Sequence, residues 1–205
     1  MNYVSNFLSE NETTIWMAYF QSDEINWTQE TFSIYGRQVK VPRKSAFFGD
    51  DGLNYRYTGI DHLGRGWSSK MLALKAQVEK ESRSKFNFCL VNYYRIGLDY
   101  MGWHKDNEQS SERLIASLSL GAPRRFRIRL DNETEDLWLE NGSLLVFDGY
   151  LEHTLPRMRK VNQPRINLTF RTIKTSTSKE ILGLKIRWAS RLSPCWVVLL
   201  DPLLS

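Results

Sequence analysis

The stretch MGWHKDNE, residues 101–108, carries the first side chains that could together hold a metal ion. His104 and Asp106 lie two positions apart, so on a strand both side chains would project from one face. A third donor, His153, follows at the end of LLVFDGYLEH, which we expect to be a strand. Two histidines and one carboxylate on adjoining strands form a facial triad, which leaves three positions of an iron ion open. Zinc hydrolases use the same donors, so the triad alone does not choose the metal.

The run RINLTFR, residues 165–171, indicates a second reactant. On a strand, period two places Arg165, Asn167, Thr169 and Arg171 on one face, and the three apolar residues between them on the face toward the core. Two arginines are usually part of a solvated face, but the preceding His-x-Asp and His weaken that alternative. Because the guanidinium fork pairs with a carboxylate in bidentate fashion, two such arginines would suit a dicarboxylate such as 2-oxoglutarate.

The elements that must position these residues are of two kinds. Residues 8–21 and 64–82 are predicted helices; Ser9 suits the cap of the first, and Met71, Leu74 and Val78 repeat at helical spacing in the second. Strands are expected in 26–41, around Gly36, and in 41–59, around the turn FGDDG. From residue 86 onward, short runs of apolar residues alternate with Gly, Pro, Asn and Asp, which is typical of antiparallel double sheets. In RFRIRL the apolar side chains face one way and the arginines face solvent. We therefore predict an α+β fold, a double-stranded β-helix (jelly roll) flanked by N-terminal helices.

Composition limits the class of protein. The 205 residues include 41% hydrophobic and 25% charged residues, as in an ordinary globular domain. The formal net charge of +5 favours polyanionic partners, although a solvated basic surface explains it equally well. Cys89 and Cys195 form no disulfide framework, which favours a reducing compartment. The N-terminus lacks the basic region of a secretory signal and no apolar run approaches a membrane span, so we expect a cytoplasmic protein (nuclear in a eukaryote), a monomer with no membrane partner.

Seven stretches together resemble the AlkB family of Fe(II)/2-oxoglutarate-dependent nucleic-acid demethylases. They are VPRKSAFFGD, FNFCLVNYYR, YMGWHKDNE, SLSLGAPRRF, GSLLVF, EHTLP and RINLTFR, and they cover roughly residues 35–173. VPRK…GD together with DYMGWHKDNE is similar to the members that act on DNA. The resemblance implies one dioxygenase domain over 1–173, with a substrate-recognition part over about 1–85, a jelly-roll core over about 86–173 and an extension over 174–205 whose role is unknown.

The resemblance also implies roles for individual residues. His104, Asp106 and His153 would be the metal ligands and the catalytic centre. The residues that would bind the cosubstrate 2-oxoglutarate are Asn92, Tyr94, Arg165, Asn167, Thr169 and Arg171. Arg165 would pair with the distal carboxylate and Arg171 with the carboxylate beside the keto group.

The implied substrate contacts lie on both sides of the metal motif. Tyr55 or Tyr57 would stack an extruded base against the ring of His104, although both tyrosines would otherwise be ordinary sheet packing. Asn107 and Glu108 fall where the family contacts the edge of the base, with Asn107 replacing the usual Asp. Tyr35 falls where some members carry an aromatic wedge, and ordinary strand packing is an equal alternative for it.

The function implied is oxidative demethylation of 1-methyladenine and 3-methylcytosine in DNA, or also in RNA, with Fe(II), 2-oxoglutarate and O2 and with release of formaldehyde. Two alternatives stay open. One is an oxygenase of the same fold that acts on a protein or a small molecule. The other is an inactive relative that only binds nucleic acid, because the segment FDGYLEH is shorter by several residues than is usual in the family.

Overall fold

The structure, a computed structural model, describes residues 1–34, 37–57, 60–64, 66–107, 111–131 and 133–174. All of these residues belong to one compact unit, Met1–Lys174. The extension predicted for 174–205 lies outside the described residues, apart from its first residue. None of the helices in the described ranges has the length and apolar character needed to cross a membrane.

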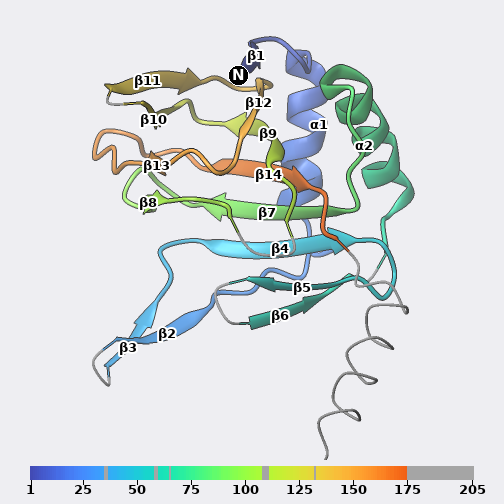
Figure 1. The fold of residues 1–205 in the computed structure, drawn as a ribbon, viewed down its shortest axis with the longest axis horizontal. Helices are drawn as coiled ribbons and strands as arrows, with labels where there is room; N and C mark the ends of the chain where they lie inside the picture. Colours follow the sequence, from blue (N-terminus) through green and yellow to red (C-terminus); the bar gives the residue numbers. More distant parts are fainter. Residues whose placement is uncertain (35–36, 58–59, 65, 108–110, 132, 175–205) are drawn as a thin grey trace, which may run out of the picture. The chain divides into compact units, whose positions relative to one another are not determined.

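Two antiparallel sheets form the body of this unit (Figure 1). The larger sheet has the strand order β1-β12-β9-β14-β7-β4, and the smaller one has the order β11-β10-β13-β8. The larger sheet consists of β1 (Asn2–Val4), β4 (Lys44–Gly49), β7 (Phe88–Tyr94), β9 (Leu114–Gly121), β12 (Leu144–Asp148) and β14 (Arg165–Arg171). The smaller sheet consists of β8 (Met101–His104), β10 (Arg124–Leu130), β11 (Glu133–Leu139) and β13 (His153–Leu155). From β7 onward the chain passes repeatedly between the two sheets, which confirms the predicted jelly roll.

Two hairpins complete the strands of the N-terminal half. One joins β2 (Thr31–Ile34) to β3 (Arg37–Lys40), and the other joins β5 (Asn54–Tyr57) to β6 (Ile60–Leu63). Strands were predicted in both regions, and these predictions are confirmed. Gly36, the expected turn residue of the first hairpin, lies outside the described residues.

Two helices cover one face of the larger sheet (Figure 1). Helix α1 (Glu10–Gln21) begins after Ser9, whose hydroxyl accepts from the backbone N–H of Glu12 while the Glu12 carboxylate accepts from the backbone N–H of Ser9. This capping box confirms the predicted helix start, because it satisfies N–H groups that the first helical turn leaves without partners. Helix α2 (Ser69–Ser82) is shorter than the predicted 64–82, because the hydroxyl of Ser68 caps it at the backbone N–H of Met71.

The alternation of residues in β14 separates the core from the site. Ile166, Leu168 and Phe170 are completely buried in the cluster beneath the helices. The same cluster contains Met71, Leu74 and Val78 of α2, as their helical spacing predicted. The opposite face of β14 points into the space between the two sheets, where a second cluster is built around Ile115, Phe126 and Phe147.

Two details of the predicted strands are wrong. The strand pattern after residue 86 predicts one strand for DLWLENGSLLVFDG, but a turn at Asn141 and Gly142 separates β11 from β12. It also predicts a solvated face for the arginines of RRFRIR; Arg125, Arg127 and Arg129 do lie on the outer face, but Arg124 is only 1% exposed. Arg124 has the same parity as Phe126 and Ile128, so the strand itself turns this arginine toward the interior.

Gly97 joins two loops at one end of the jelly roll. Its N–H donates to the Val161 carbonyl at 2.7 Å, and its carbonyl accepts from the Met158 N–H at 2.8 Å. A Cβ atom on Gly97 would lie 2.0 Å from the Met158 carbonyl oxygen, whereas a Cβ atom on Gly102 would meet nothing within 4 Å. We expect Gly97→Ala to lower the free energy of unfolding by about 2 kcal/mol or more, and Gly102→Ala by less than about 0.5 kcal/mol. Urea unfolding measures both, and equal stability of the two variants would contradict the predicted clash.

The Glu79 carboxylate connects the C-terminal end of α2 to the segment that leads into β7. Its carboxylate accepts from the Phe86 N–H at 3.0 Å and from Lys85 Nζ at 2.8 Å, and it pairs with Lys75 at 2.9 Å. Burial opposes ionisation, but these donors prevail and lower the pKa of Glu79 from 4.5 to about 2. A lowered pKa in the folded state stabilises the protein above the unfolded pKa, and this contribution is lost as the pH falls toward the folded pKa.

We therefore expect Glu79→Gln to reduce the free energy of unfolding at pH 7 by about 2 kcal/mol. The difference from the wild type should shrink as the pH falls from 4.5 to about 2, where Glu79 becomes protonated. Urea unfolding at several pH values measures this difference. Glu24→Gln, which removes an exposed carboxylate paired with Lys70 at 3.8 Å, is the control. A Glu79→Gln effect that does not vary with pH would argue against the charged contacts as its cause.

Candidate metal centre

Two strand ends and the segment after β8 bring His104, Asp106 and His153 together. His104 is the last residue of β8, His153 is the first residue of β13, and the two are direct partners in the antiparallel ladder. Two expectations about these elements are corrected. Asp106 is not on the strand with His104; it follows the end of β8, and its N–H donates to the Gly149 carbonyl at 2.7 Å. His153 does not end the strand that starts at Leu144, because β12 stops at Asp148 and a turn leads into β13.

The three side chains make a compact donor set. One ligand atom from each of them lies within 4.8 Å of the others. The Nε2 atom of His104 is 3.8 Å from Asp106 Oδ1, and the Nε2 atom of His153 is 3.6 Å from Asp106 Oδ2. The short FDGYLEH segment thus still delivers His153 to the other two donors.

Backbone carbonyls orient both imidazole rings. His104 Nδ1 lies 2.9 Å from the Gly102 carbonyl, and His153 Nδ1 lies 2.8 Å from the Leu151 carbonyl. A carbonyl can only accept a hydrogen bond, so each Nδ1 carries the proton and each Nε2 keeps its lone pair. The Phe147 ring meets the His153 ring edge to face, with centroids 5.0 Å apart, and restricts its rotation. The lone pairs of both Nε2 atoms are therefore available on the side of Asp106.

The charges of the cluster suit a cation. Burial by itself would raise the pKa of Asp106, but the Arg171 guanidinium at 2.9 Å holds it well below its usual range. Burial and the nearby His153 ring lower the pKa of His104. Asp106 is thus a carboxylate and His104 a neutral imidazole at neutral pH, which are the protonation states that metal ligands require.

A pocket of about 490 Å³, counted out to its open mouth, extends from these donors between the two sheets. Its larger-sheet wall contains Arg165, Asn167, Thr169 and Arg171, so the predicted common face of RINLTFR is confirmed. Asn92 and Tyr94 of β7 line the same pocket. The structure therefore gathers around one cavity all of the residues that were expected to bind metal or cosubstrate.

Unsatisfied polar atoms show what kind of ligands this pocket fits. Asp106 Oδ1 is buried and accepts no hydrogen bond from the described residues. Arg165 is 2% exposed; its Nη2 donates to Ser119 Oγ at 3.0 Å, but its Nε and Nη1 find no acceptor within the described ranges. Burial lowers the pKa of Arg165 to about 10, so it stays cationic at neutral pH. A divalent cation beside Asp106 and an anion beside Arg165 would satisfy these groups, and Fe(II) and 2-oxoglutarate have those charges.

Three polar residues that hold side chains of the pocket in place were not predicted: Ser119, Ser117 and Arg43. Ser119 holds Arg165, and Ser117 Oγ accepts from Asn167 Nδ2 at 2.8 Å. In β7, Asn92 Oδ1 accepts from the Nε atom of buried Arg43 at 2.8 Å, so the Asn92 amide N–H2 is left to donate elsewhere. The alternation of serine and leucine in SLSLG could have indicated the two serines, because period two places both on one face. Nothing in the sequence indicated Arg43.

The expected substrate contacts are only partly within the described residues. Asn107 is exposed directly after Asp106. Tyr55 and Tyr57 belong to β5, but only their backbone falls within the described part. Tyr35 and Glu108 lie outside the described residues.

Comparisons with known proteins agree with this geometry. The family model of the 2OG-Fe(II) oxygenase superfamily matches residues 1–171. The chain is 34% identical to DNA oxidative demethylase ALKBH2 of Bos taurus over 73% of this chain and 59% of that protein. It is also 34% identical to alpha-ketoglutarate-dependent dioxygenase alkB homolog 3 of Bos taurus, over 73% of this chain and 58% of that protein. The chain therefore spans somewhat under two thirds of the length of these relatives.

A solved structure supports the fold independently. The crystal structure of an oxidoreductase of the 2OG-Fe(II) oxygenase family from Burkholderia pseudomallei superposes with a TM-score of 0.56 at 13% identity, and covers 80% of each chain. The resemblance to AlkB-type proteins is confirmed by the curated relatives, and the jelly roll by this structure. With a family model that covers most of its length, the chain belongs to the 2OG-Fe(II) oxygenase superfamily.

Proposed function

We propose that this chain is an oxidative demethylase that repairs alkylated bases in DNA, of the 1-methyladenine and 3-methylcytosine type. One observation carries the proposal: a His-Asp-His cluster shares a pocket with a buried arginine whose Nε and Nη1 find no acceptor among the described residues, in a chain similar to DNA oxidative demethylase ALKBH2. RNA is a second substrate class to be tested.

His104, Asp106 and His153 would hold the metal through two Nε2 atoms and one carboxylate. When bound, Fe(II) together with 2-oxoglutarate and O2 would supply the oxidation that lets an N-methyl group leave as formaldehyde. Arg171 keeps Asp106 ionised and fixes one of its oxygens. The apolar rings of Phe126 and Phe147 pack against His153 and keep water from that side of the donors.

The cosubstrate would lie along the polar face of β14. Arg165 would donate N–H groups of its guanidinium to the distal carboxylate, which offsets the cost of burying this cation. Asn92, whose carbonyl oxygen is occupied by Arg43, would donate through its amide N–H2. Asn167 is held by Ser117 and by the Leu118 carbonyl, and accepts from Thr169 Oγ1 at 3.2 Å, so these two residues would orient that wall of the pocket. Tyr94 would complete the subsite, and Arg171 would contact the carboxylate next to the keto group.

A base must leave the helical stack before it can reach a pocket between two sheets. Methylated bases that carry a positive charge pair poorly, so extruding them costs less. Asn107 and Glu108 would contact the edge of the base, Tyr55 or Tyr57 would stack on it, and Tyr35 would fill the gap it leaves.

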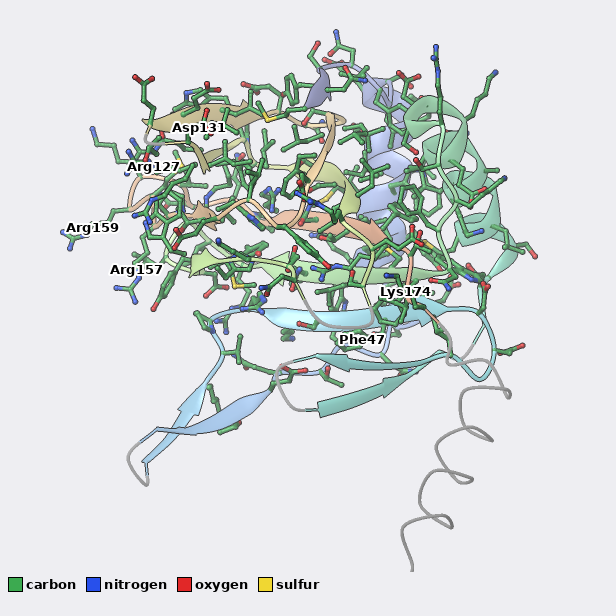
Figure 2. All side chains as sticks on the ribbon, viewed as in Figure 1. Phe47, Arg127, Asp131, Arg157, Arg159 and Lys174 are labelled. Carbon is green, nitrogen blue, oxygen red and sulfur yellow. The ribbon has the colours of Figure 1, made fainter. Side chains whose placement is uncertain are left out.

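An exposed basic loop suits a nucleic-acid partner. Arg157, Arg159 and Lys160, between β13 and β14, form no ion pair with any carboxylate of the described residues, and Figure 2 shows Arg157 and Arg159 pointing outward. Arg157 stacks over the Tyr100 ring at 4.2 Å. Such cations attract phosphates, which position a nucleic acid without specifying its sequence.

The proposal includes the domain organisation, the oligomeric state and the location of the protein. Residues 1–173 would form a single dioxygenase domain in which 1–85 contribute to substrate recognition. The protein would act as a monomer in the cytoplasm, or in the nucleus of a eukaryote.

Anaerobic loading with Fe(II) and 2-oxoglutarate, followed by air and a 3-methylcytosine oligonucleotide, tests the proposal. We expect formaldehyde and repaired base in equal amounts, with succinate. Succinate without repair would indicate an oxygenase that acts on another substrate. Oligonucleotide binding without succinate would indicate an inactive relative, and each of these results would overturn the proposed function.

A further inference from the structure

A second buried arginine, Arg124, lies near the Tyr94 ring, which lines the pocket. Arg124 is 1% exposed and is among the largest fully buried side chains. No carboxylate of the described residues forms an ion pair with it, and its Nε donates to no acceptor among them. Burial lowers the pKa of Arg124, which reflects the cost of keeping this cation away from water. The Asp99 carboxylate attracts Arg124 from a distance, but it forms its ion pair with Arg95. A buried cation without an ion pair of its own calls for an explanation beyond stability.

Neutral groups hold Arg124 in place. Its Nη2 lies 2.9 Å from the Asp99 carbonyl, 2.8 Å from the Pro156 carbonyl and 3.3 Å from the Gly97 carbonyl. These carbonyls belong to the two loops that meet at Gly97. They orient the guanidinium, but they do not neutralise its charge.

Arg124 and the pocket residue Arg165 both lie near the ring of Tyr94. The guanidinium carbon of Arg124 lies 5.9 Å from the centre of the Tyr94 ring, and that of Arg165 lies 5.5 Å from the same centre. The two cations are therefore no farther apart than the sum of these distances, and Arg124 contributes to the lowered pKa of Arg165. Tyr94 and Arg165 line the pocket, whereas Arg124 does not. Arg124 can thus act on a ligand only through its field and through these two residues.

We propose that Arg124 is a positioning residue that makes the part of the pocket at Arg165 and Tyr94 selective for a ligand with a second carboxylate. The proposal rests on the proposed function, in that the dicarboxylate lies against Arg165. Two like charges near one ring repel each other, and an anion between or beside them removes this penalty. A ligand that ends in a methyl group would leave both cations without compensation. Arg124 thereby contributes to the discrimination between 2-oxoglutarate and 2-oxoacids with one carboxylate.

Equilibrium binding to the Mn(II)-loaded protein, measured by calorimetry, tests this role without turnover. The two probes are 2-oxoglutarate and 2-oxopentanoate, which has the same carbon chain but no distal carboxylate. A unit charge at about 10 Å in a medium of effective dielectric about 20 alters a binding constant roughly tenfold. We expect Arg124→Met to raise the dissociation constant of 2-oxoglutarate about tenfold and to change that of 2-oxopentanoate by less than about twofold.

Arg125→Met is the matched control. Arg125 is the next residue of β10, but it lies on the outer face and pairs with Asp136 at 3.5 Å. We expect it to leave the affinity for both probes unchanged. Equal losses for both probes in Arg124→Met would show that Arg124 only holds the loops, and would overturn the proposal. No loss for either probe would overturn it as well.

Two further variants separate charge from packing. Arg124→Lys keeps the charge and should keep the preference for 2-oxoglutarate, whereas Arg124→Gln keeps donors for the carbonyls and should lose it. These two variants decide the question if Arg124→Met does not fold, and a folded Arg124→Lys without the preference would contradict the proposal. A wild-type protein that binds both probes equally well would instead refute the placement of the dicarboxylate at Arg165, which belongs to the proposed function.

Discussion

We expect Asp106→Ala to abolish 2-oxoglutarate turnover and to weaken Mn(II) binding at least about a hundredfold. Removal of a residue that only orients a metal ligand typically lowers metal affinity by about 10- to 100-fold, and removal of the ligand itself should cost more. Asp106 is the single anion of the donor set. Without it, only two imidazoles would face a divalent cation next to the Arg171 guanidinium, which lies 2.9 Å from the carboxylate in the wild type. The field at the site would then repel a cation rather than attract it.

Mn(II) binding, monitored by electron paramagnetic resonance, measures this loss of metal affinity without any substrate. Asp136→Ala is the control, since Asp136 is also a carboxylate paired with an arginine, Arg127 at 2.7 Å, but lies on the outer face of the smaller sheet. It should bind Mn(II) like the wild type. If Asp106→Ala were folded and still bound the metal with wild-type affinity, His104, Asp106 and His153 would not be the metal site.

The second large effect is expected for Arg165→Met. Each charge-assisted hydrogen bond contributes about 1.5–3 kcal/mol, so loss of two of them should raise the dissociation constant of 2-oxoglutarate at least about a hundredfold. In the ligand-free protein, the same change removes a buried cation whose Nε and Nη1 have no acceptor among the described residues. Replacing such a charge by an apolar side chain is often neutral or stabilising. We therefore expect Arg165→Met to lose cosubstrate affinity while its unfolding temperature stays equal to, or rises above, that of the wild type.

Calorimetric titration with 2-oxoglutarate and a thermal melt of the ligand-free protein measure the two quantities. Arg129→Met serves as the control, because Arg129 is half exposed and pairs with Glu152 at 2.6 Å on the outer face. It should leave the cosubstrate affinity unchanged. A strongly destabilised Arg165→Met would mean that Arg165 is a structural residue, and retained affinity would place the dicarboxylate elsewhere.

Local patterns in the sequence determined much of this protein. The period of two in RINLTFR was enough to separate Arg165 and Arg171 from the apolar residues, because a strand in a half-buried sheet offers only two faces. The start of α1 followed from Ser9 and Glu12, since capping depends on neighbours within one helical turn. His104, Asp106 and His153 could be proposed as metal ligands because their donor atoms suit a metal ion and the flanking stretches resemble the AlkB family.

Only the tertiary structure decided how these groups meet. Asp106 lies beyond the end of β8 and depends on the Gly149 carbonyl for its position, while His153 reaches His104 through the register of β13 with β8. Arg124 carries the same charge as the three outward-facing arginines that follow it in β10, and its burial depends on carbonyls of two distant loops. A strand pattern gives the face on which a residue lies. It does not give the residues that the side chain contacts on that face, because those residues come from segments far away in the chain.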